Sequence, residues 1–359
     1  MKKTKQKYII ILCVLLSTLY MIFAFHPLNH EIHFVPVWAI DSSRASFSKD
    51  EAIPEELYED AIPFKLGQTL GYFTNNGKIL MSETFPYKAS ITEHQYVTYG
   101  TDSAEMPFYN PKGEEIGKIK GYGFPYFQDN RKFLFLPGGS SFSKLGEDGS
   151  IEWTYEGYAP ITAFSSSEKR AVVGLAEGNI ISFTEDGQID QEFKPVGSAY
   201  KVILGAAVSN DGEYVAAVSG QEEQRFVLAR KVNGYMEVVF HKYLGSDSNR
   251  QVLVKFSKDE NYIYFNYEGG IGIVNTKTHR FSQIPIKGHI LSIRESEQNG
   301  IIFILSKNGK TYTVSAVELF DIFRGAFSFE ADSAFIAVRD DSLFVGRNSR
   351  ICKMTVTNK

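Results

Sequence analysis

Short apolar runs bounded by turn residues recur along this chain, and this recurrence limits its possible folds more than any other feature of the sequence. Residues 149–187 contain four such runs, at 151–155, 161–164, 171–175 and 179–183. They are rich in Val, Ile, Phe and Tyr and are separated by Gly, Asp, Glu and Ser, which is typical of antiparallel strands joined by tight turns. A single sheet of this kind cannot bury both faces or protect its edges, so it needs copies of itself.

The chain supplies those copies at a period near 40 residues. A hairpin pattern recurs at 88–100, 125–136, 161–175, 206–219, 253–265, 291–305 and 326–338. Its turn residues are Glu93, Asp129, Ser167, Asp211, Asp259, Gln298 and Ala331, with spacings of 36, 38, 44, 48, 39 and 33. A second marker, the turn glycine before the last strand of a repeat, falls at Gly77, Gly113, Gly149 and Gly187. Two independent markers therefore agree on the period.

Repeats of about 40 residues with four strands each are typical of propeller blades, in which every blade packs against its neighbours. We expect an all-β domain over 62–359, a β-propeller of four-stranded antiparallel blades. Residues 66–82 add a strand pair before the first marked repeat. The ring then has either seven blades with an outer N-terminal addition or eight blades with one partial blade. We favour seven, because four strands, at 326–330, 334–338, 342–346 and 351–356, already complete the last repeat.

The N-terminus has the pattern of an export signal or membrane anchor. Lys2, Lys3, Lys5 and Lys7 precede residues 8–25, which carry no charge. We expect residues 1–25 to be an uncleaved signal anchor with a transmembrane helix in the inner membrane, rather than a removed signal peptide. Everything from residue 26 onward would then lie outside the cytoplasm, in the periplasm or at the cell surface; cleavage would make the protein secreted.

Residues 26–61 are expected to be a stalk. Pro27, Pro36 and Pro54 interrupt this segment, and acidic residues fill its second half, including 50–60. Such a composition offers little apolar surface for folding alone. Within it, residues 54–58 are predicted to form one helical turn that begins with proline.

Composition excludes some classes of partner and site. The net charge of −4 argues against nucleic acid, because phosphate binding needs a concentrated basic face. Cys13 and Cys352 are the two cysteines, and Cys13 lies in the apolar N-terminal run, so a disulfide between them is not expected. Two cysteines are also too few for a structural metal site of their own.

Three stretches carry a resemblance to known repeat propellers. They are SNDGEYVAAVS at 209–219, FSKDENYIYFNYEGGIGIVNTKT at 256–278, and Gly288-His289 with the hairpin that follows. They resemble WD40-like and quinoprotein (PQQ)-like repeats, over residues 62–357. The chain departs from both patterns, because no blade ends in Trp-Asp and Trp38 and Trp153 are its two tryptophans. The resemblance implies kinship with envelope-localised, non-enzymatic propellers, such as the propeller lipoprotein of the outer-membrane assembly machine.

Histidines are the first candidates for chemistry. His26, His30 and His33 lie close together after the apolar run, but prolines interrupt the segment and no cysteine or well-spaced carboxylate completes a metal site, so we interpret them as polar residues at a membrane edge. The other histidines are His94, His241, His279 and His289, which fall on different repeats. In a propeller, such residues could converge on the axial channel.

Three further patterns favour structural roles. The Asp-Gly pairs at 148–149, 186–187 and 211–212 are typical of hairpin turns and lack the ligand spacing of a calcium loop. The Pro-Gly-Gly-Ser-Ser run at 137–141 lacks the Gly-x-Ser-x-Gly pattern and has no histidine placed to activate a serine. The aromatic-rich run at 262–267 alternates like a half-buried strand, so we expect core packing.

These patterns assign no catalytic, cofactor-binding or metal-binding residue, and no cofactor is expected. We therefore expect a membrane-anchored, extracytoplasmic β-propeller that is not an enzyme. It would act as a protein-interaction scaffold in the bacterial envelope. Its expected partners are envelope proteins and, through residues 8–25, the inner membrane. We do not expect it to bind nucleic acid. The alternative is a small-molecule-binding or hydrolytic propeller, which requires a channel lined by His, Asp or Arg from several blades. A degenerate quinoprotein is disfavoured by the missing tryptophans.

Overall fold

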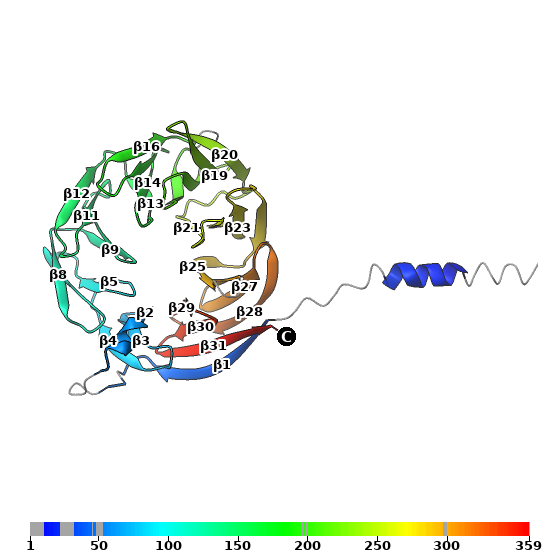
Figure 1. Ribbon diagram of the computed structural model, residues 1–359, viewed down its shortest axis with the longest axis horizontal. Coiled ribbons are helices and arrows are strands. Elements are labelled where there is room, and N and C mark those ends of the chain that lie inside the picture. Colours follow the sequence, from blue (N-terminus) through cyan, green and yellow to red (C-terminus); the bar gives the residue numbers. More distant parts are fainter. Residues whose placement is uncertain are drawn as a thin grey trace, which may run out of the picture.

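The computed structural model describes residues 11–21, 32–44, 46–47, 53–195, 197, 200–296 and 300–358. The strands in this part of the chain form eight antiparallel sheets, which stand around a ring as the blades of a propeller (Figure 1). In blades 1 to 7 the first strand lies nearest the axis and the last strand lies at the outer edge. The predicted all-β propeller of four-stranded blades is therefore confirmed.

The blades follow one another along the chain. Blade 1 contains β2 (Ile62–Leu66), β3 (Thr69–Phe73) and β4 (Ile79–Thr84); blade 2 contains β5 (Lys88–Ile91), β6 (Tyr96–Tyr99), β7 (Glu105–Tyr109) and β8 (Glu115–Lys120). Blade 3 contains β9 (Phe124–Gln128), β10 (Arg131–Phe135), β11 (Ser141–Leu145) and β12 (Ile151–Glu156). Blade 4 contains β13 (Ile161–Ser166), β14 (Ala171–Leu175), β15 (Ile180–Phe183) and β16 (Ile189–Phe193).

The second half of the ring continues this order. Blade 5 contains β17 (Ile203–Val208), β18 (Tyr214–Ser219), β19 (Arg225–Val232) and β20 (Tyr235–Tyr243); blade 6 contains β21 (Val254–Phe256), β22 (Tyr262–Tyr267), β23 (Gly270–Asn275) and β24 (Phe281–Pro285). Blade 7 contains β25 (His289–Ser296), β26 (Ile301–Asn308), β27 (Thr311–Glu318) and β28 (Ile322–Glu330). Blade 8 contains β29 (Ala334–Arg339), β30 (Ser342–Arg347), β31 (Arg350–Asn358) and, as its outer strand, β1 (Ile32–Asp41).

The eight sheets show that the favoured number of seven blades is wrong and that eight, with blade 1 built from three strands, is correct. The error came from residues 326–330, which were counted as the first strand of the last repeat. They are the end of β28, the outer strand of blade 7. Blade 8 is therefore one strand short, and β1 fills the open position.

The outer strand of blade 8 comes from the predicted stalk, so the boundary at residue 62 is also wrong. β1 pairs with β31 from Ile32↔Asn358 to Asp41↔Arg350, with one bulge between Pro36 and Trp38. Proline is tolerated here because an outer strand has one edge without a partner, and the bulge takes up the irregularity. The N-terminal strand thus closes the ring.

The described end of the predicted stalk, residues 53–61, packs against blades 1 and 2. Residues 56–59 form the short helix α2 (Glu56–Glu59), which confirms the predicted helical turn. Leu57 and Tyr58 are half-buried against the core of blades 1 and 2. Lys112, on the β7–β8 turn, pairs with Glu55 and lies 5.7 Å from the centre of the Tyr58 ring. At least this part of the acidic stretch is docked rather than free in solvent.

Apolar residues fill the spaces between neighbouring blades. Phe226 of β19 and Phe265 of β22 stack with ring centres 4.3 Å apart, joining blades 5 and 6. The run at 262–267 forms β22, and its four middle residues are buried, which confirms the core interpretation. Inter-blade packing of this kind replaces a single central core and leaves the axis open.

The four marker glycines all precede an outer strand, as predicted. Gly77, Gly113, Gly149 and Gly187 have φ between +82° and +88°, a conformation that a residue with a Cβ adopts only at a cost. Each turn is accompanied by a one-residue register shift against the neighbouring strand. The same glycine turn therefore leads into the outer strand of blades 1 to 4.

Two tryptophans dock an outer strand onto the next blade at such turns. Trp153 of β12 donates its Nε1 hydrogen to the Glu185 carbonyl, at 2.9 Å, and its ring lies against Gly187. Trp38 of β1 donates in the same way to the Asn75 carbonyl, at 3.2 Å. The two docks are structurally equivalent, although one lies in the middle of the chain and the other closes the ring.

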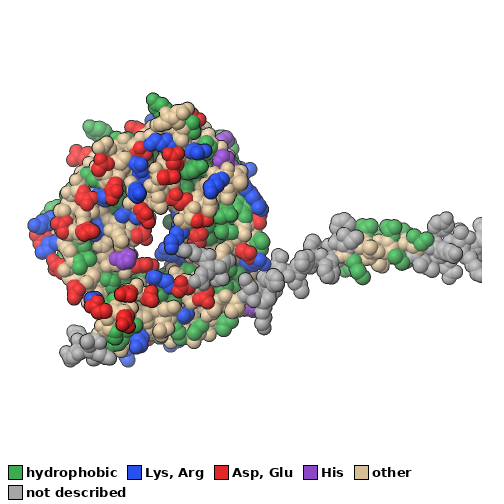
Figure 2. Space-filling view, viewed as in Figure 1, with side chains coloured by type: hydrophobic (Ala, Val, Ile, Leu, Met, Phe, Trp, Pro, Cys, Tyr) green, Lys and Arg blue, Asp and Glu red, His purple; other side chains and the backbone are tan. Residues whose placement is uncertain are grey.

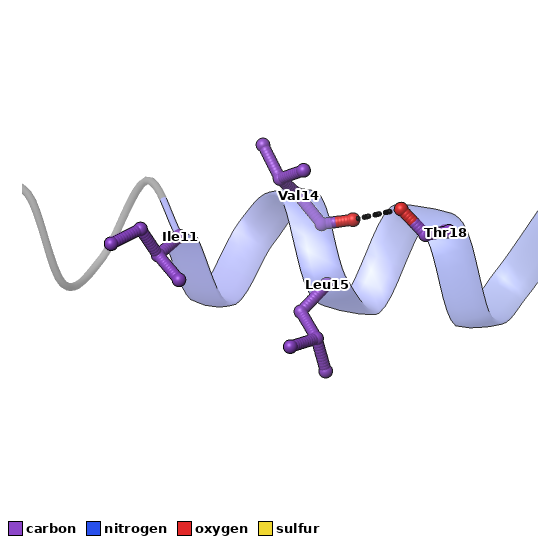
Figure 3. Close-up of a pocket in the computed structure, with 4 residues that line it drawn as sticks. All are labelled: Ile11, Val14, Leu15 and Thr18. Carbon is purple, nitrogen blue, oxygen red and sulfur yellow. Dashed lines mark hydrogen bonds between the residues drawn. The ribbon is translucent and has the colours of Figure 1, made fainter.

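The predicted anchor is described only in part. Residues 11–21 are helical with exposed apolar side chains, and the Thr18 hydroxyl donates to the Val14 carbonyl, at 2.7 Å (Figure 3). The ends of the predicted segment, 8–10 and 22–25, lie outside the described residues. Among the residues that are described, no helix combines the length and apolar character needed to cross a membrane.

Candidate functional site

The central channel is the part of the ring where charged side chains from different blades face one another. Figure 2 shows acidic and basic side chains around a hollow at the centre of the molecule. Lys255 lies on β21 and Arg294 on β25, the inner strands of adjacent blades, and each stands two residues before a buried turn serine, Ser257 or Ser296. Their equivalent positions bring the two cations to the same level of the channel, close to the mouth formed by the inner hairpin turns.

Both cations are reached by solvent and are nevertheless surrounded by protein, as expected for side chains in a narrow channel. This enclosure lowers the pKa of Lys255, and the positive charge of Arg294 lowers it further, against the opposing effect of the Glu295 and Asp129 carboxylates. Enclosure likewise lowers the pKa of Arg294, against the opposing effect of Asp129 and Glu93. Because Asp129 belongs to blade 3 and influences both cations, the groups interact electrostatically across the channel.

The carboxylates at this mouth already have cationic partners. Asp129, in the β9–β10 turn, pairs with Arg131 at 2.8 Å. Glu93, in the β5–β6 turn, pairs with Arg339 at the end of β29, at 3.1 Å. In the described part of the chain, no carboxylate lies within ion-pair distance of Lys255, and the same holds for Arg294. Among the described residues, these two channel cations therefore have no ion-pair partner.

An aromatic stripe follows the inner strand of blade 3 into the channel. Phe124 and Tyr126 of β9 are both exposed on the same face of the strand. The ring of Tyr126 packs edge-on against Phe164 of blade 4, with centres 5.6 Å apart. Enclosure raises the pKa of Tyr126, so its hydroxyl remains protonated at neutral pH and can donate a hydrogen bond.

Outside the channel, the stripe continues into an exposed patch between blades 2 and 3. The Lys88 ammonium lies 5.2 Å from the centre of the Tyr87 ring and 5.0 Å from that of Phe124. Tyr122 stands two residues before Phe124 in the connection between the blades and is 59% exposed. Tyr87, Lys88, Tyr122 and Phe124 are called the aromatic patch below. It lies at the mouth opposite the inner hairpin turns.

Blade 5 contributes no open face to the channel. Residues 251–253, which lead into blade 6, cross over β17: Val252 N–H donates to the Leu204 carbonyl at 2.9 Å, and Gln251 Nε2 reaches the Thr162 carbonyl of blade 4 at 2.8 Å. All six residues of β17 are buried as a result. The wall of the channel is therefore asymmetric, with aromatic rings on blades 3 and 4 and cations on blades 6 and 7.

Hydrogen bonds between neighbouring inner turns hold these walls in place. Glu295 of blade 7 accepts from the Tyr264 hydroxyl and the Lys258 N–H of blade 6, both at 3.2 Å. Similar bonds join the remaining blades from 2 to 8: Gln95–Asn130, Gln128–Ser166, Ser167–Ser209, Asn210–Glu260 and Ser296–Asp340. The Glu93–Arg339 ion pair joins blade 8 to blade 2 and completes this belt.

The structure does not bring the predicted histidines together. His94 lies in the β5–β6 turn and His289 begins β25, whereas His241 lies on the outer strand β20. His279 follows β23 and stacks on Phe240 of β20, with ring centres 5.9 Å apart. His33 is on β1, and His26 and His30 lie outside the described residues. Among the residues that the structure places, no three His, Cys, Asp or Glu side chains gather in a way that could hold a metal ion.

The other candidates have the structural roles expected of them. Gly149, Gly187 and Gly212 all have positive φ in tight turns. The Leu136 N–H donates to the Ser141 carbonyl, at 3.0 Å, across the Gly138–Gly139 turn, so the 137–141 run is a strand connection. Both cysteines are free.

Lys255 and Arg294 had no signal in the sequence. Each is a single basic residue in a strand with alternating polarity, which is a common pattern at exposed strand positions. The two residues are also 39 positions apart in the sequence. The equivalence of their positions relative to the turn serines could have identified them, but only with the correct strand assignment.

Comparisons with known proteins agree with this architecture. A sequence model of a family described as "beta-propeller protein" matches residues 1–359. A protein of Treponema pallidum (strain Nichols), named only as uncharacterised, is 27% identical over 358 residues, which cover 99% of this chain and 95% of that protein.

Similar solved structures agree in fold alone. BamB from Moraxella catarrhalis has a TM-score of 0.62 at 10% identity, over 90% of this chain and 100% of that one. The computationally designed Ika8 protein has a TM-score of 0.63 at 12% identity, over 92% and 100%. A chain of the mitotic checkpoint complex has a TM-score of 0.56 at 10% identity, over 93% and 95%.

Proposed function

This chain belongs to the β-propeller protein family, and from that premise we propose that it is a non-enzymatic scaffold that binds a protein partner in the bacterial envelope. The observation that carries the proposal is the aromatic patch. Exposed aromatic side chains are enriched in protein interfaces, and Tyr is among the residues that most often dominate their binding energy. Lys88 and Phe124 are the first residues of β5 and β9 and are paired with the next strands of their blades, so little backbone entropy is lost there on binding.

Crosslinking of the full-length protein in envelope membranes, read by mass spectrometry, tests this function. We expect crosslinks from the neighbourhood of the aromatic patch to one envelope protein, and their loss in the double variant Tyr122→Ala/Phe124→Ala. Tyr235→Ala is the matched control, because Tyr235 is 76% exposed on the outer strand β20. Unchanged crosslinks in the double variant, or crosslinks confined to the chain itself, would contradict the proposal.

We also propose that residues 8–25 anchor the propeller in the inner membrane, with the propeller outside the cytoplasm. Support comes from the lysines that precede this apolar run and from the exposed apolar side chains of 11–21. Alkaline extraction of membranes, with determination of the mature N-terminus, is the measurement. The full chain should stay in the membrane pellet, whereas a chain that begins at residue 32 should be released; a mature N-terminus beyond residue 25 would argue for cleavage.

We also propose that the chain is a divergent member of the WD40-like and quinoprotein-like repeat propellers. The repeated tryptophan dock supports it. Absence of aromatic residues at the positions of Trp38 and Trp153 in further relatives would count against it.

A second candidate function is the binding of a small molecule in the central channel. Charged side chains from blades 2, 3, 6, 7 and 8 at one mouth favour it. Equilibrium binding of small molecules to the purified full chain, with channel variants, tests this candidate.

A further inference from the structure

The two channel cations stand at equivalent positions on neighbouring inner strands, and among the described residues no carboxylate lies within ion-pair distance of either. Two like charges side by side in an enclosed site raise the free energy of the folded protein, because each loses hydration and repels the other. Such an arrangement persists at positions where a ligand supplies the missing charge. The nearby carboxylates are already occupied: Asp129 and Glu93 are each paired with another arginine. Glu295, whose charge also acts on Lys255, accepts hydrogen bonds from Tyr264 and from the Lys258 N–H and is not within ion-pair distance of Lys255.

Lys255 and Arg294 complement each other as ligands for an oxyanion. The guanidinium of arginine presents a planar pair of donors that matches the two oxygens of a carboxylate, and the lysine ammonium adds a compact charge. Both side chains stand on β-strands fixed by the belt, because Glu295, the residue after Arg294, accepts bonds from blade 6. The donors are therefore positioned before any ligand arrives.

The facing wall indicates what the remainder of the ligand resembles. Across the channel, blade 3 presents the ring and the protonated hydroxyl of Tyr126, with Phe124 nearer the opposite mouth. An aromatic wall favours a ligand with an apolar body over a fully hydrated inorganic anion.

We propose that Lys255 and Arg294 bind the carboxylate of a small organic acid in the central channel, with the apolar body of the acid toward Tyr126. This inference rests on the second candidate function and is independent of the aromatic patch and its protein partner. It names the residues, the charge and the chemical class of the ligand.

Equilibrium titration of the full chain with benzoate, benzamide and inorganic phosphate, at neutral pH and constant ionic strength, tests the proposal. Benzoate should bind, and benzamide, which has the same shape without the charge, should bind at least about tenfold more weakly. Lys255→Gln and Arg294→Gln should each weaken benzoate about tenfold or more, because each removes a charge-assisted hydrogen bond. Lys310→Gln, which removes an equal charge on an 82% exposed side chain, should leave the affinity unchanged.

Stability measurements separate loss of a site from loss of the fold. Since Lys255 and Arg294 lack a partner, both variants should unfold at or above the temperature of the parent protein. In the binding titrations, Tyr126→Leu should weaken the binding of benzoate severalfold and leave the binding of phosphate unchanged.

Three outcomes would overturn the proposal. Equal binding of benzamide and benzoate would leave a small-molecule site in place but exclude the carboxylate. If Lys310→Gln weakened benzoate binding as much as the channel variants do, the attraction would be a non-specific effect of positive charge. No binding of any probe would remove the second candidate function together with the inference.

Discussion

Blade 8 and blade 3 have the same architecture but are assembled from the chain in different ways. Blade 3 uses one continuous segment, from β9 to β12, and its strands are joined by short turns. Blade 8 takes β29, β30 and β31 from the C-terminal end and β1 from the N-terminal end. Both present a tryptophan on the outer strand to the next blade. Equivalent contacts therefore act locally in blade 3, whereas in blade 8 they hold together the two ends of a ring.

The difference is one of entropy. Joining β1 to β31 closes a loop of nearly the whole propeller, which costs more conformational entropy than closing a hairpin. The contacts of β1 must offset this cost: Phe34 and Trp38 pack against Phe303, Phe327 and Phe344. Substitutions in blade 8 should thus lower the stability of the whole ring. Matched substitutions in blade 3 should cause a smaller loss of stability.

Removal of residues 1–41 should have the largest effect. It deletes β1 and exposes the edge of β31 together with apolar side chains that Phe34 and Trp38 cover, a loss of about 4 kcal/mol or more. Chemical denaturation should show a lower midpoint and a broader transition than in a chain that begins at residue 32. Equal stability of the two truncated chains would show that β1 does not hold the ring closed.

Substitution of the turn glycines should have the next largest effect and should rank by what each glycine touches. In Gly187→Ala, the new Cβ would lie 2.5 Å from the Trp153 ring, in addition to the strain of positive φ, so we expect a loss of about 3 kcal/mol. Gly113 has the same φ and open space around it, so Gly113→Ala should cost about 1 kcal/mol. Gly77→Ala, with its Cβ 3.1 Å from Trp38, should fall between them. Urea unfolding gives the free energy of unfolding of the three variants. An equal loss of stability in all three would mean that contact with a docking tryptophan contributes nothing.

Replacement of the docking tryptophans by phenylalanine compares the two blades directly. Each change removes one hydrogen bond and some apolar contact, about 1 kcal/mol for Trp153→Phe. Trp38→Phe should cost about 2 kcal/mol, because its hydrogen bond is less exposed and it lies on the strand that closes the ring, whereas both rings contact two phenylalanines. Thermal unfolding of the two variants is the measurement, and a larger loss in Trp153→Phe would reverse the comparison.

A lysine–amide contact between blades should show the smallest effect. Lys132 of blade 3 is 5% exposed, donates to Gln95 Oε1 at 3.2 Å and lies over the Phe108 ring. Burial lowers the pKa of Lys132, so the folded state disfavours its protonated form. Stability should therefore rise with pH as the solution passes from this lowered pKa toward the ordinary pKa of lysine. Lys132→Met should change stability by less than about 1 kcal/mol near neutral pH and abolish that rise; a persistent rise would assign it to another group.

The strands were predictable from the sequence, but their grouping into blades was not. The runs at 151–155 and 161–164 are both strands, yet the first is β12 of blade 3 and the second is β13 of blade 4. A turn within a blade and a connection between blades use the same residue types, so the pattern does not reveal where one blade ends. β1 was missed because Pro36 and the exposed positions around it obscure the alternation, which an outer strand can tolerate.

The candidate site was not predictable, because it exists only after the ring has closed. Lys255 and Arg294 belong to separate repeats, and Asp129 approaches them from across the channel. Their relation depends on the number of blades and on residues 251–253, which cover β17. The aromatic run at 262–267, by contrast, was placed correctly in the core because its alternation is local.

The pairing of β1 with β31 also determines how the ring responds to mechanical load. The two strands are antiparallel, so residue 32 and residue 358 lie at the same end of the pair. Tension applied between these two ends loads the Ile32↔Asn358 pair first and then each following pair in turn. The hydrogen bonds break one after another, as in unzipping, rather than together, as in shear. The pairing that closes the propeller should therefore open from the chain ends at a lower force than a strand pair loaded in shear.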